Sequence, residues 1–232
     1  MEKNHRQLVA GISHDLRTPL ATIQGYVETL LMKKKELGAA QQERYLNIIQ
    51  DGTHQLQHLV EDLFELSKLE ANETPLQTEP FSLADLAGDN AARCQIAAHE
   101  KQITLNINVS PDLPLVTGDI RYIDRVLQNL FDNAVKYCDI NGKIIVELIS
   151  HRQEVAFRIA NTGVGIDPTD LTHLFDAYHT GKRTKKNIPQ SKSSTGLGLA
   201  IVKKILQKHG STITVESEAN GMTVFTFSLK ID

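Results

Sequence analysis

The sequence QNLFDNAVKY, residues 128–137, combines apolar positions with a polar stripe and lies in a helix predicted over 120–137. Asn129, Asn133 and Lys136 recur at positions i, i+4 and i+7, which share one face of a helix. Asparagine is a poor helix former, so two of them on one stripe face either solvent or a ligand. Amide oxygens suit Mg²⁺, which takes hard oxygen donors and keeps water and phosphate as its other ligands. The stretch therefore predicts either a polar outer face or a magnesium and phosphate site.

Two glycine turns follow this helix and flank a basic stretch. A strand predicted over 154–160 runs into NTGVGI, residues 161–166, where Gly163 and Gly165 permit close backbone approach to a ligand. The sequence TGLGL, residues 195–199, opens a helix predicted near 198–209, and the start of a helix favours anions. Between the turns, residues 181–192 contain no acidic residue and five basic ones, Lys182 and Arg183 among them. This basic stretch is either a solvated loop or a lid over phosphates.

The rest of residues 81–232 mixes helices with short strands. Helices are predicted over about 83–100, 120–137 and 198–209, and strands over 103–109, 143–150, 154–160, 211–217 and 222–229. Strands adjacent in the chain, with helices grouped among them, indicate an α/β sandwich in which helices cover one face of a mixed sheet. Residues 71–80 contain two prolines and no periodicity, so we expect a linker there.

The first 70 residues carry two heptad patterns joined by a short turn, which predicts a helical hairpin. The first pattern comprises Val9, Leu16, Ile23 and Leu30, and the second comprises Ile49, Leu56 and Leu63, with Leu59 and Leu66 between them. Such a hairpin leaves one apolar face uncovered, and a second copy completing a four-helix bundle is the simplest cover. We therefore expect an α+β homodimer with domains at 1–70 and 81–232, joined by residues 71–80.

Composition excludes several other classes of protein. The chain has 232 residues, with 25 Lys and Arg against 28 Asp and Glu, and a net charge of −3 argues against a surface built for nucleic acid. Cys94 and Cys138 lie far apart, which excludes a zinc cluster and suits a reducing cytoplasm. His54 and His58 form an i, i+4 pair without a third ligand and are interpreted as a solvated face. No apolar run approaches the about 18 residues of a membrane span, and no signal peptide is expected.

His14 stands in the segment HDLRTPL, residues 14–20, at an exposed f position of the first heptad pattern. Asp15 follows it, Thr18 lies one turn further on, and Pro19 removes a helix hydrogen bond, so we expect a kink there. A proline inside a helix costs about 3 kcal/mol, which points to a purpose. An exposed imidazole beside a carboxylate suits nucleophilic attack, whereas a lone exposed histidine is ordinarily a solvated surface group.

The segment HDLRTPL closely resembles the phosphoacceptor box of sensor histidine kinases. Four further segments, QNLFDNAVKY, NTGVGI, LFDAYHT and STGLGLAI, resemble in this order the N, G1, F and G2 boxes of that family's catalytic domain, a Bergerat-fold ATPase. The resemblance covers about residues 5–230. It implies that residues 81–232 bind ATP and Mg²⁺, and that residues 1–70 form a dimerisation and histidine-phosphotransfer domain.

The resemblance also implies roles for individual residues. His14 would accept phosphate, Asp15 would act as general base, and Thr18 would position water for phosphatase activity toward a partner. Asn133 would be the Mg²⁺ ligand, supported by Asn129. Lys136 would contact phosphate and Tyr137 would lie against adenine. The other residues of the boxes and lid that would shape or contact the nucleotide site are Gly163, Gly165, Lys182, Arg183, Thr195, Gly196, Leu197 and Gly198.

One position departs from the family's pattern. Most members carry aspartate where this chain has Asn161, at the residue that reads the adenine amino group. The side-chain oxygen of asparagine still accepts that hydrogen bond, but it is a weaker acceptor than a carboxylate. We expect reduced nucleotide affinity or specificity without loss of the fold.

Three functions follow from these residues. The favoured one is an ATP-dependent protein-histidine kinase core that autophosphorylates His14, passes the phosphoryl group to an aspartate of a response-regulator receiver domain, and has the residues to dephosphorylate it. The second is a gyrase- or chaperone-type ATPase. Proteins of that kind resemble one another in carrying Glu where this chain has Asn129, and this counts against the second function because asparagine cannot serve as a base. The third is a degenerate kinase that works as a dimeric scaffold or mainly as a phosphatase, because of Asn161. The expected location is the cytoplasm, as a subunit by itself or as the cytoplasmic portion of an inner-membrane sensor, with no membrane contact within this chain.

Overall fold

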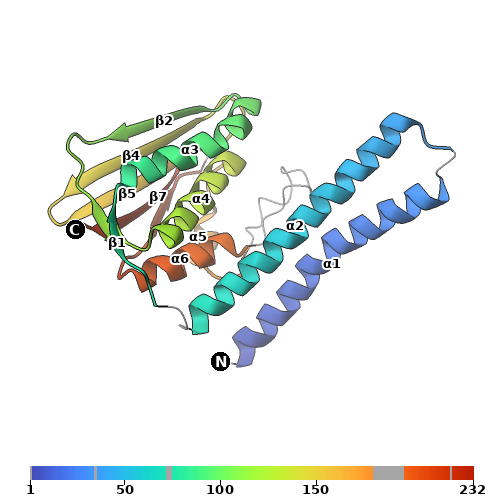
Figure 1. The fold of residues 1–232 in the computed structure, drawn as a ribbon, viewed down its shortest axis with the longest axis horizontal. Coiled ribbons are helices and arrows are strands. Elements are labelled where there is room, and N and C mark those ends of the chain that lie inside the picture. The colour runs from blue at the N-terminus through green and yellow to red at the C-terminus, as the bar shows by residue number, and fades with distance from the viewer. Residues whose placement is uncertain (1, 34–35, 72–74, 180–195, 220) are drawn as a thin grey trace.

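The computed structural model describes residues 2–33, 36–71, 75–179, 196–219 and 221–232, and of residues 2–15 the backbone alone. Two long helices, α1 (Glu2–Met32) and α2 (Ala39–Ala71), form the predicted hairpin (Figure 1). Tyr26 of α1 packs against Tyr45 of α2 with ring centroids 5.0 Å apart. Further along, Gly52 of α2 lies against Ile23 and close to the carbonyl oxygen of Pro19. The two helices therefore run antiparallel, and α1 continues through Pro19.

The remaining chain forms a layered α/β unit. Its elements in order are β1 (Glu79–Phe81), α3 (Leu83–Glu100), β2 (Thr104–Val109), β3 (Val116–Gly118), α4 (Ile120–Tyr137), β4 (Lys143–His151), β5 (Glu154–Thr162), α5 (Pro168–Leu171), α6 (Gly198–Lys208), β6 (Thr214–Ser217) and β7 (Met222–Lys230). Five strands form one sheet in the order β2-β4-β5-β7-β6. The pair β2 and β4 is parallel and the other pairs are antiparallel, so the sheet is mixed. Helices α3, α4 and α6 lie on one face of it (Figure 1), which confirms the predicted fold class.

The core lies between this sheet and its helices. Alternate residues of β4 and β5 are buried, as expected for strands with one face against helices. Phe157 of β5 is fully buried between Phe131 of α4 and Phe227 of β7, at ring-centroid distances of 6.3 and 5.1 Å. These rings join helix α4 to the middle of the sheet, so the polar face of α4 is held pointing away from the core.

Helix α4 is anchored at its first turn by a buried carboxylate. Asp119 caps the helix, and its side chain accepts hydrogen bonds from the backbone N–H of Gln77 and from the side chain of Arg121. Burial pushes the pKa of Asp119 upward, but the hydrogen bonds from Arg121 and Gln77 outweigh it and hold the pKa below its ordinary value. The carboxylate is therefore ionised at neutral pH and fixes the start of the helix.

The C-terminal half of α2 packs on this α/β unit. Leu66 and Leu69 belong to the same buried cluster as the core of the sheet, and Leu59 is 1% exposed. Helix α2 contacts α6 along this side, with α1 on its other side (Figure 1). Leu56 and Leu63 are half-buried and Leu59 is buried, whereas Leu66 packs into the buried cluster of the α/β unit. Leu66, expected in the hairpin seam, therefore contributes to the core of the α/β unit. Leu59 lies one heptad after Gly52, on the face of α2 that packs on α1, so its expected seam position stays a prediction.

Several boundaries differ from the predicted ones. The expected linker of residues 71–80 includes the end of α2 and the first residues of β1, which pairs with β3 in a small second sheet. Neither strand was predicted, because three residues are too few to show alternation. Strand β6 begins at Thr214 rather than at 211, and β5 continues to Thr162. Asn161 therefore belongs to β5, where it pairs with Thr223 of β7.

The described residues also bear on membrane crossing and on the state of the two cysteines. Among them, no helix combines the length and apolarity that a membrane crossing needs. Cys94 and Cys138 are both buried free thiols, and burial raises the pKa of each above the ordinary thiol value.

Candidate functional site

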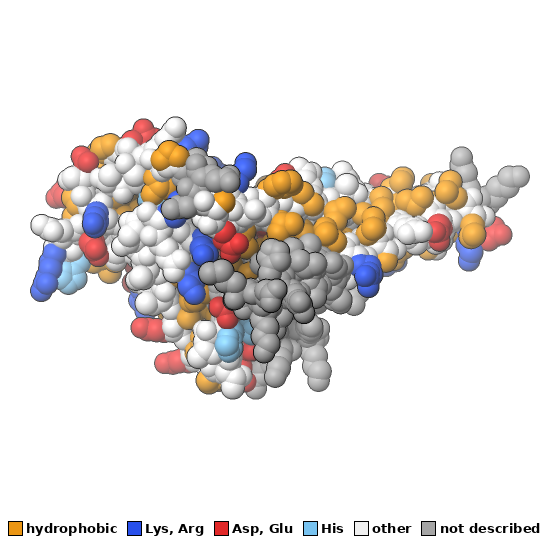
Figure 2. Space-filling view, turned by 90° about the horizontal axis from the view of Figure 1, so that it is seen from below, with side chains coloured by type: hydrophobic (Ala, Val, Ile, Leu, Met, Phe, Trp, Pro, Cys, Tyr) orange, Lys and Arg blue, Asp and Glu red, His pale blue; other side chains and the backbone are white. Residues whose placement is uncertain are grey.

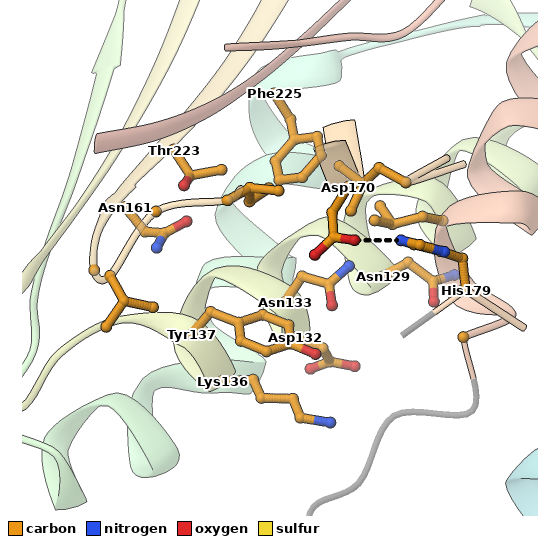
Figure 3. A pocket seen from close by; sticks show the side chains of 18 of the residues that line it. Asn129, Asp132, Asn133, Lys136, Tyr137, Asn161, Asp170, His179, Thr223 and Phe225 are labelled. Carbon is orange, nitrogen blue, oxygen red and sulfur yellow. Dashed lines mark ion pairs between the residues drawn. The ribbon is translucent and has the colours of Figure 1, made fainter. Parts of the chain in front are cut away.

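A cavity of about 360 Å³ opens between α4, the turn after β5, the start of α6 and the middle of α2 (Figure 3). Its size is that of a small-ligand pocket. Nine residues that the sequence singled out line it together: Asn129, Asn133, Lys136, Tyr137, Asn161, Gly163, Gly165, Gly196 and Gly198. Segments far apart in the chain thus meet at one site.

The polar stripe of α4 forms one wall of the cavity. The side-chain amide of Asn129 donates to the carbonyl oxygen of Arg125 at 2.9 Å, which fixes its rotamer and frees its oxygen. Gly198 at the start of α6 approaches this oxygen so closely that a Cβ there would lie 2.5 Å from it. The second turn therefore requires glycine at position 198, because a side chain would displace Asn129. The positively charged group on this wall is Lys136, one residue short of the end of the helix.

The opposite end of the cavity is mainly apolar. Its walls there are the side chains of Val164, Ile166, Leu174 and Phe225. One buried amide, Asn161, stands among them, 5% exposed, beside Thr223 (Figure 3). A pocket with an apolar end and a polar end suits a ligand that carries an aromatic ring system and charged groups.

The first glycine turn is shaped by close backbone contacts. A Cβ on Gly163 would lie 2.6 Å from the carbonyl oxygen of Tyr137, at the end of α4. Gly165 has a φ of +74°, and a Cβ there would overlap the carbonyl oxygen of Glu218. Both positions therefore need glycine, which lets the turn close over the cavity.

An ion pair that the sequence analysis missed lies across the cavity. Asp170 of α5 and His179 approach within 3.4 Å, and both line the pocket (Figure 3). Tyr178, the residue before His179, donates its backbone N–H to the carbonyl oxygen of Gly196 at 2.9 Å. The pair and this hydrogen bond join α5 to the start of α6. His179 lies within the segment LFDAYHT, so the motif marked the region although no role was given to the residue.

Helix α2 supplies a wall that the sequence did not predict. Gln55, His58 and Asp62 of α2 line the cavity opposite α4. The guanidinium of Arg125 on α4 forms ion pairs with both Asp62 and Glu65, the latter at 2.9 Å. His58, expected on a solvated face, is exposed and also lies beside the cavity.

Asp132 is a cavity-lining residue whose carboxyl pKa is shifted. Desolvation by the surrounding walls raises the pKa of Asp132 above its ordinary value, against the opposing effects of Arg125, His58 and Lys136. A perturbed carboxyl in a cleft is typical of a functional site, although ion-pair networks perturb pKa values too.

Not every predicted residue reaches this cavity. Lys182, Arg183 and Thr195 lie outside the described residues. Leu197 is fully buried in the core at the start of α6 and does not line the pocket. Thr18 lies exposed on α1, where its carbonyl oxygen accepts a hydrogen bond from the hydroxyl of Thr22 at 3.0 Å. His14 and Asp15 lie in the same helix, for which the backbone alone is described.

The donors at the cavity suit a hard cation held jointly with a ligand. Within the described ranges, no group of three or more His, Cys, Asp or Glu side chains could hold a metal ion by itself. Asn133 contributes an amide oxygen on the wall that also carries Asn129 and Lys136. Mg²⁺ commonly takes one or two protein oxygens and completes its shell with water and phosphate oxygens. The residues present therefore fit Mg²⁺ that arrives with a nucleotide.

Two family models match the chain in the order of its two parts. The model described as "His Kinase A (phospho-acceptor) domain" matches residues 4–72, and "Histidine kinase-, DNA gyrase B-, and HSP90-like ATPase" matches residues 118–232. The chain belongs to the sensor histidine kinases. Among curated relatives, it is 34% identical to "Drug sensory protein A" of Synechocystis sp. and 32% identical to "Signal transduction histidine-protein kinase BarA" of Escherichia coli, each over 97% of this chain.

Solved histidine kinases share the whole fold. The Acinetobacter baumannii histidine kinase AdeS superposes with a TM-score of 0.74 at 25% identity, covering 94% of this chain and 98% of that one. The histidine kinase ThkA, solved in complex with the response regulator protein TrrA, gives 0.78 at 26% identity and covers 97% of this chain and 61% of that one. The chain spans 35% and 24% of the lengths of the two curated relatives, so it corresponds to one region of those histidine kinases.

Proposed function

We propose that the chain is an ATP-dependent protein-histidine kinase core, in which residues 81–232 bind ATP and residues 1–70 carry the phosphoacceptor, His14. An imidazole nitrogen of His14 attacks the γ-phosphorus, the bond to the bridging oxygen breaks, and ADP leaves. Asp15 accepts the imidazole proton as general base. Transfer of this kind depends mainly on positioning and charge neutralisation.

The cavity supports this proposal because its polar and apolar lining side chains lie at different ends. Lys136, Asn129 and Asn133 lie at its polar end and suit the phosphates, whereas Asn161 and the apolar side chains suit the base. Asn133 would hold Mg²⁺, with Asn129 in support, and bound Mg²⁺ would neutralise phosphate charge. Tyr137, at the boundary, would lie against the adenine ring, and the glycines of both turns would let the backbone close around the nucleotide.

The observation that carries the proposal is the position of the cavity along the helical hairpin, compared with the position of residue 14. Tyr26 packs opposite Tyr45, and Gly52 lies against the turn that contains Pro19 and Ile23. By this antiparallel register, His14 lies level with Gln57. Gln57 lies between the cavity-lining residues Gln55 and His58. The nucleotide pocket and the phosphoacceptor thus stand at the same height along the hairpin.

Helix α2 separates the two partners of the reaction in this arrangement. It lies between α1 and the α/β unit (Figure 1), and it contacts both α1 and α6. Transfer therefore requires either movement of the α/β unit around α2 or delivery to His14 of a partner subunit in a dimer.

A homodimer is supported by the uncovered face of the hairpin. Large apolar side chains lie exposed along it: Leu20, Val27, Leu31, Leu46, Val60 and Phe64. Figure 2 shows hydrophobic side chains following the length of the hairpin. An apolar stripe this long on two helices is typical of a helix-bundle interface, and a second copy would complete a four-helix bundle. The predicted dimer thus has a surface of the right kind.

The downstream partner is proposed from chemistry and from the relatives. ThkA was solved in complex with a response regulator protein. A phosphohistidine transfers its phosphoryl group readily, and we propose an aspartate of a receiver domain as the acceptor. Thr18, exposed on α1 one turn beyond His14, is accessible to such a partner and would position water for the reverse, phosphatase reaction.

Incubation with ATP labelled at the γ-phosphorus tests the proposal. We expect acid-labile, alkali-stable label on the chain that is lost in His14→Ala and in Asn133→Ala. His54→Ala, which removes an exposed histidine of α2, is the matched control and should keep the label. Release of free phosphate without labelled protein would favour an ATPase instead, and label that survives His14→Ala would contradict the assigned acceptor.

A further inference from the structure

Asn161 is the buried amide at the apolar end of the cavity. It is 5% exposed, and within the described chain its side chain makes one hydrogen bond, from its nitrogen to the carbonyl oxygen of Thr162 at 3.3 Å. Its side-chain oxygen lies on the cavity side, where Figure 3 shows the residue among the lining side chains. A ligand that enters this end therefore meets one amide as its polar partner on β5.

An amide offers what a carboxylate cannot. Its oxygen accepts a hydrogen bond, and after a half-turn of the side chain its nitrogen donates one, whereas an ionised carboxylate only accepts. The 6-amino group of adenine is a donor and the 6-oxo group of guanine or hypoxanthine is an acceptor. Asn161 in its present orientation would accept from adenine, and turned over it would donate to a 6-oxopurine.

The cost of that half-turn is confined to one contact. It breaks the hydrogen bond to the carbonyl oxygen of Thr162, which at 3.3 Å is long, and turns the amide oxygen toward that carbonyl oxygen, a cost that the hydrogen bond donated to a 6-oxo group offsets. A neutral hydrogen bond contributes at most about tenfold to an affinity. The neighbouring polar group, the Thr223 hydroxyl, hydrogen-bonds to the hydroxyl of Ser217 at 2.8 Å and does not hold the amide in place.

We infer that this pocket accepts 6-oxopurine nucleotides, such as GTP, alongside adenine nucleotides, because Asn161 presents a neutral amide able to turn and match either base. This inference rests on the proposed function, in that a purine nucleotide places its base against Asn161. A carboxylate at the same position would face the 6-oxo group with a second acceptor and reject it.

Calorimetric titration with MgADP and MgIDP tests the inference. Hypoxanthine differs from adenine at the position-6 group and its adjacent ring proton and lacks the 2-amino group of guanine, so IDP tests recognition at Asn161 without added bulk. We expect the parent chain to bind the two nucleotides within about tenfold of each other. In Asn161→Asp the preference for ADP should rise by at least about tenfold. Asn106→Asp, the same change of charge at an exposed site on β2, should leave the ratio unchanged.

The outcomes separate the inference from the proposed function. The inference is overturned if the parent prefers ADP over IDP by more than about tenfold, or if Asn161→Asp raises that preference by less than about tenfold. In either case, binding of ADP still upholds the nucleotide site. Binding of ADP to Asn161→Asp but not to the parent also overturns it. If no variant binds either nucleotide, the proposed function fails with it. Should Asn161→Asp not fold, as judged by circular dichroism, the parent ratio decides.

Discussion

Replacing Arg125 with methionine should loosen the contact between the hairpin and the α/β unit. The Arg125 side chain is 24% exposed and pairs with Asp62 and Glu65, which are 12% and 24% exposed. Removal of the guanidinium takes one cationic partner away from two nearby carboxylates that are largely shielded from water. Because Leu66 beside them belongs to the core of the α/β unit, the loss should appear in the unfolding of that core.

The size of the effect follows from the burial. A hydrogen bond to a charged group contributes about 1.5–3 kcal/mol, and breaking a fully buried pair costs about 3–5 kcal/mol. The pair here is intermediate, so we expect a coupling energy of about 2 kcal/mol between Arg125 and Asp62. The outer-face pair of Arg158 and Glu147, 44% and 29% exposed, is the matched comparison and should couple by less than about 1 kcal/mol.

Double-mutant cycles with urea unfolding measure both energies. One cycle uses Arg125→Met and Asp62→Asn, and the other uses Arg158→Met and Glu147→Gln. A coupling of Arg125 with Asp62 no larger than that of the outer-face pair would refute the reasoning, because burial would then have no effect on the strength of the contact.

Three further outcomes are expected. Gly165→Ala, at a φ of +74° against a backbone carbonyl, should lower the urea midpoint, whereas Gly88→Ala, in open space within α3, should raise it by the equivalent of about 1 kcal/mol. Asp119→Asn should be less stable than the parent at pH 7. Because the pKa of Asp119 is lowered by Arg121, its contribution is present above the ordinary value of 3.8 and disappears as the pH falls below it, so acid unfolding curves of the two chains should converge there. Phe64→Lys, at a side chain 64% exposed, should shift the chain from dimer to monomer in sedimentation, and an unchanged dimer would contradict the proposed interface.

Much of the fold could be predicted because its signals are local. The helices α3, α4 and α6 show a 3.6-residue apolar period and the long strands show alternation, so their existence and type followed from the residues in each window. Strands β1 and β3, of three residues each, carry no such period and exist because they pair with each other. The nine pocket residues were singled out through motifs, and the structure gathers them around one cavity, while their individual roles stay predictions.

The sequence by itself determined the helical hairpin, the polar stripe of α4 and the glycine turns, since each depends on residues close together in the chain. Only the tertiary structure decided that Leu66 packs into the α/β unit, that Asp62 and His58 form a wall of the nucleotide pocket, and that Asp170 pairs with His179. An apolar period specifies which face of a helix is buried but not which partner buries it. The partner depends on how the two parts of the chain pack together, and no window of sequence contains that information.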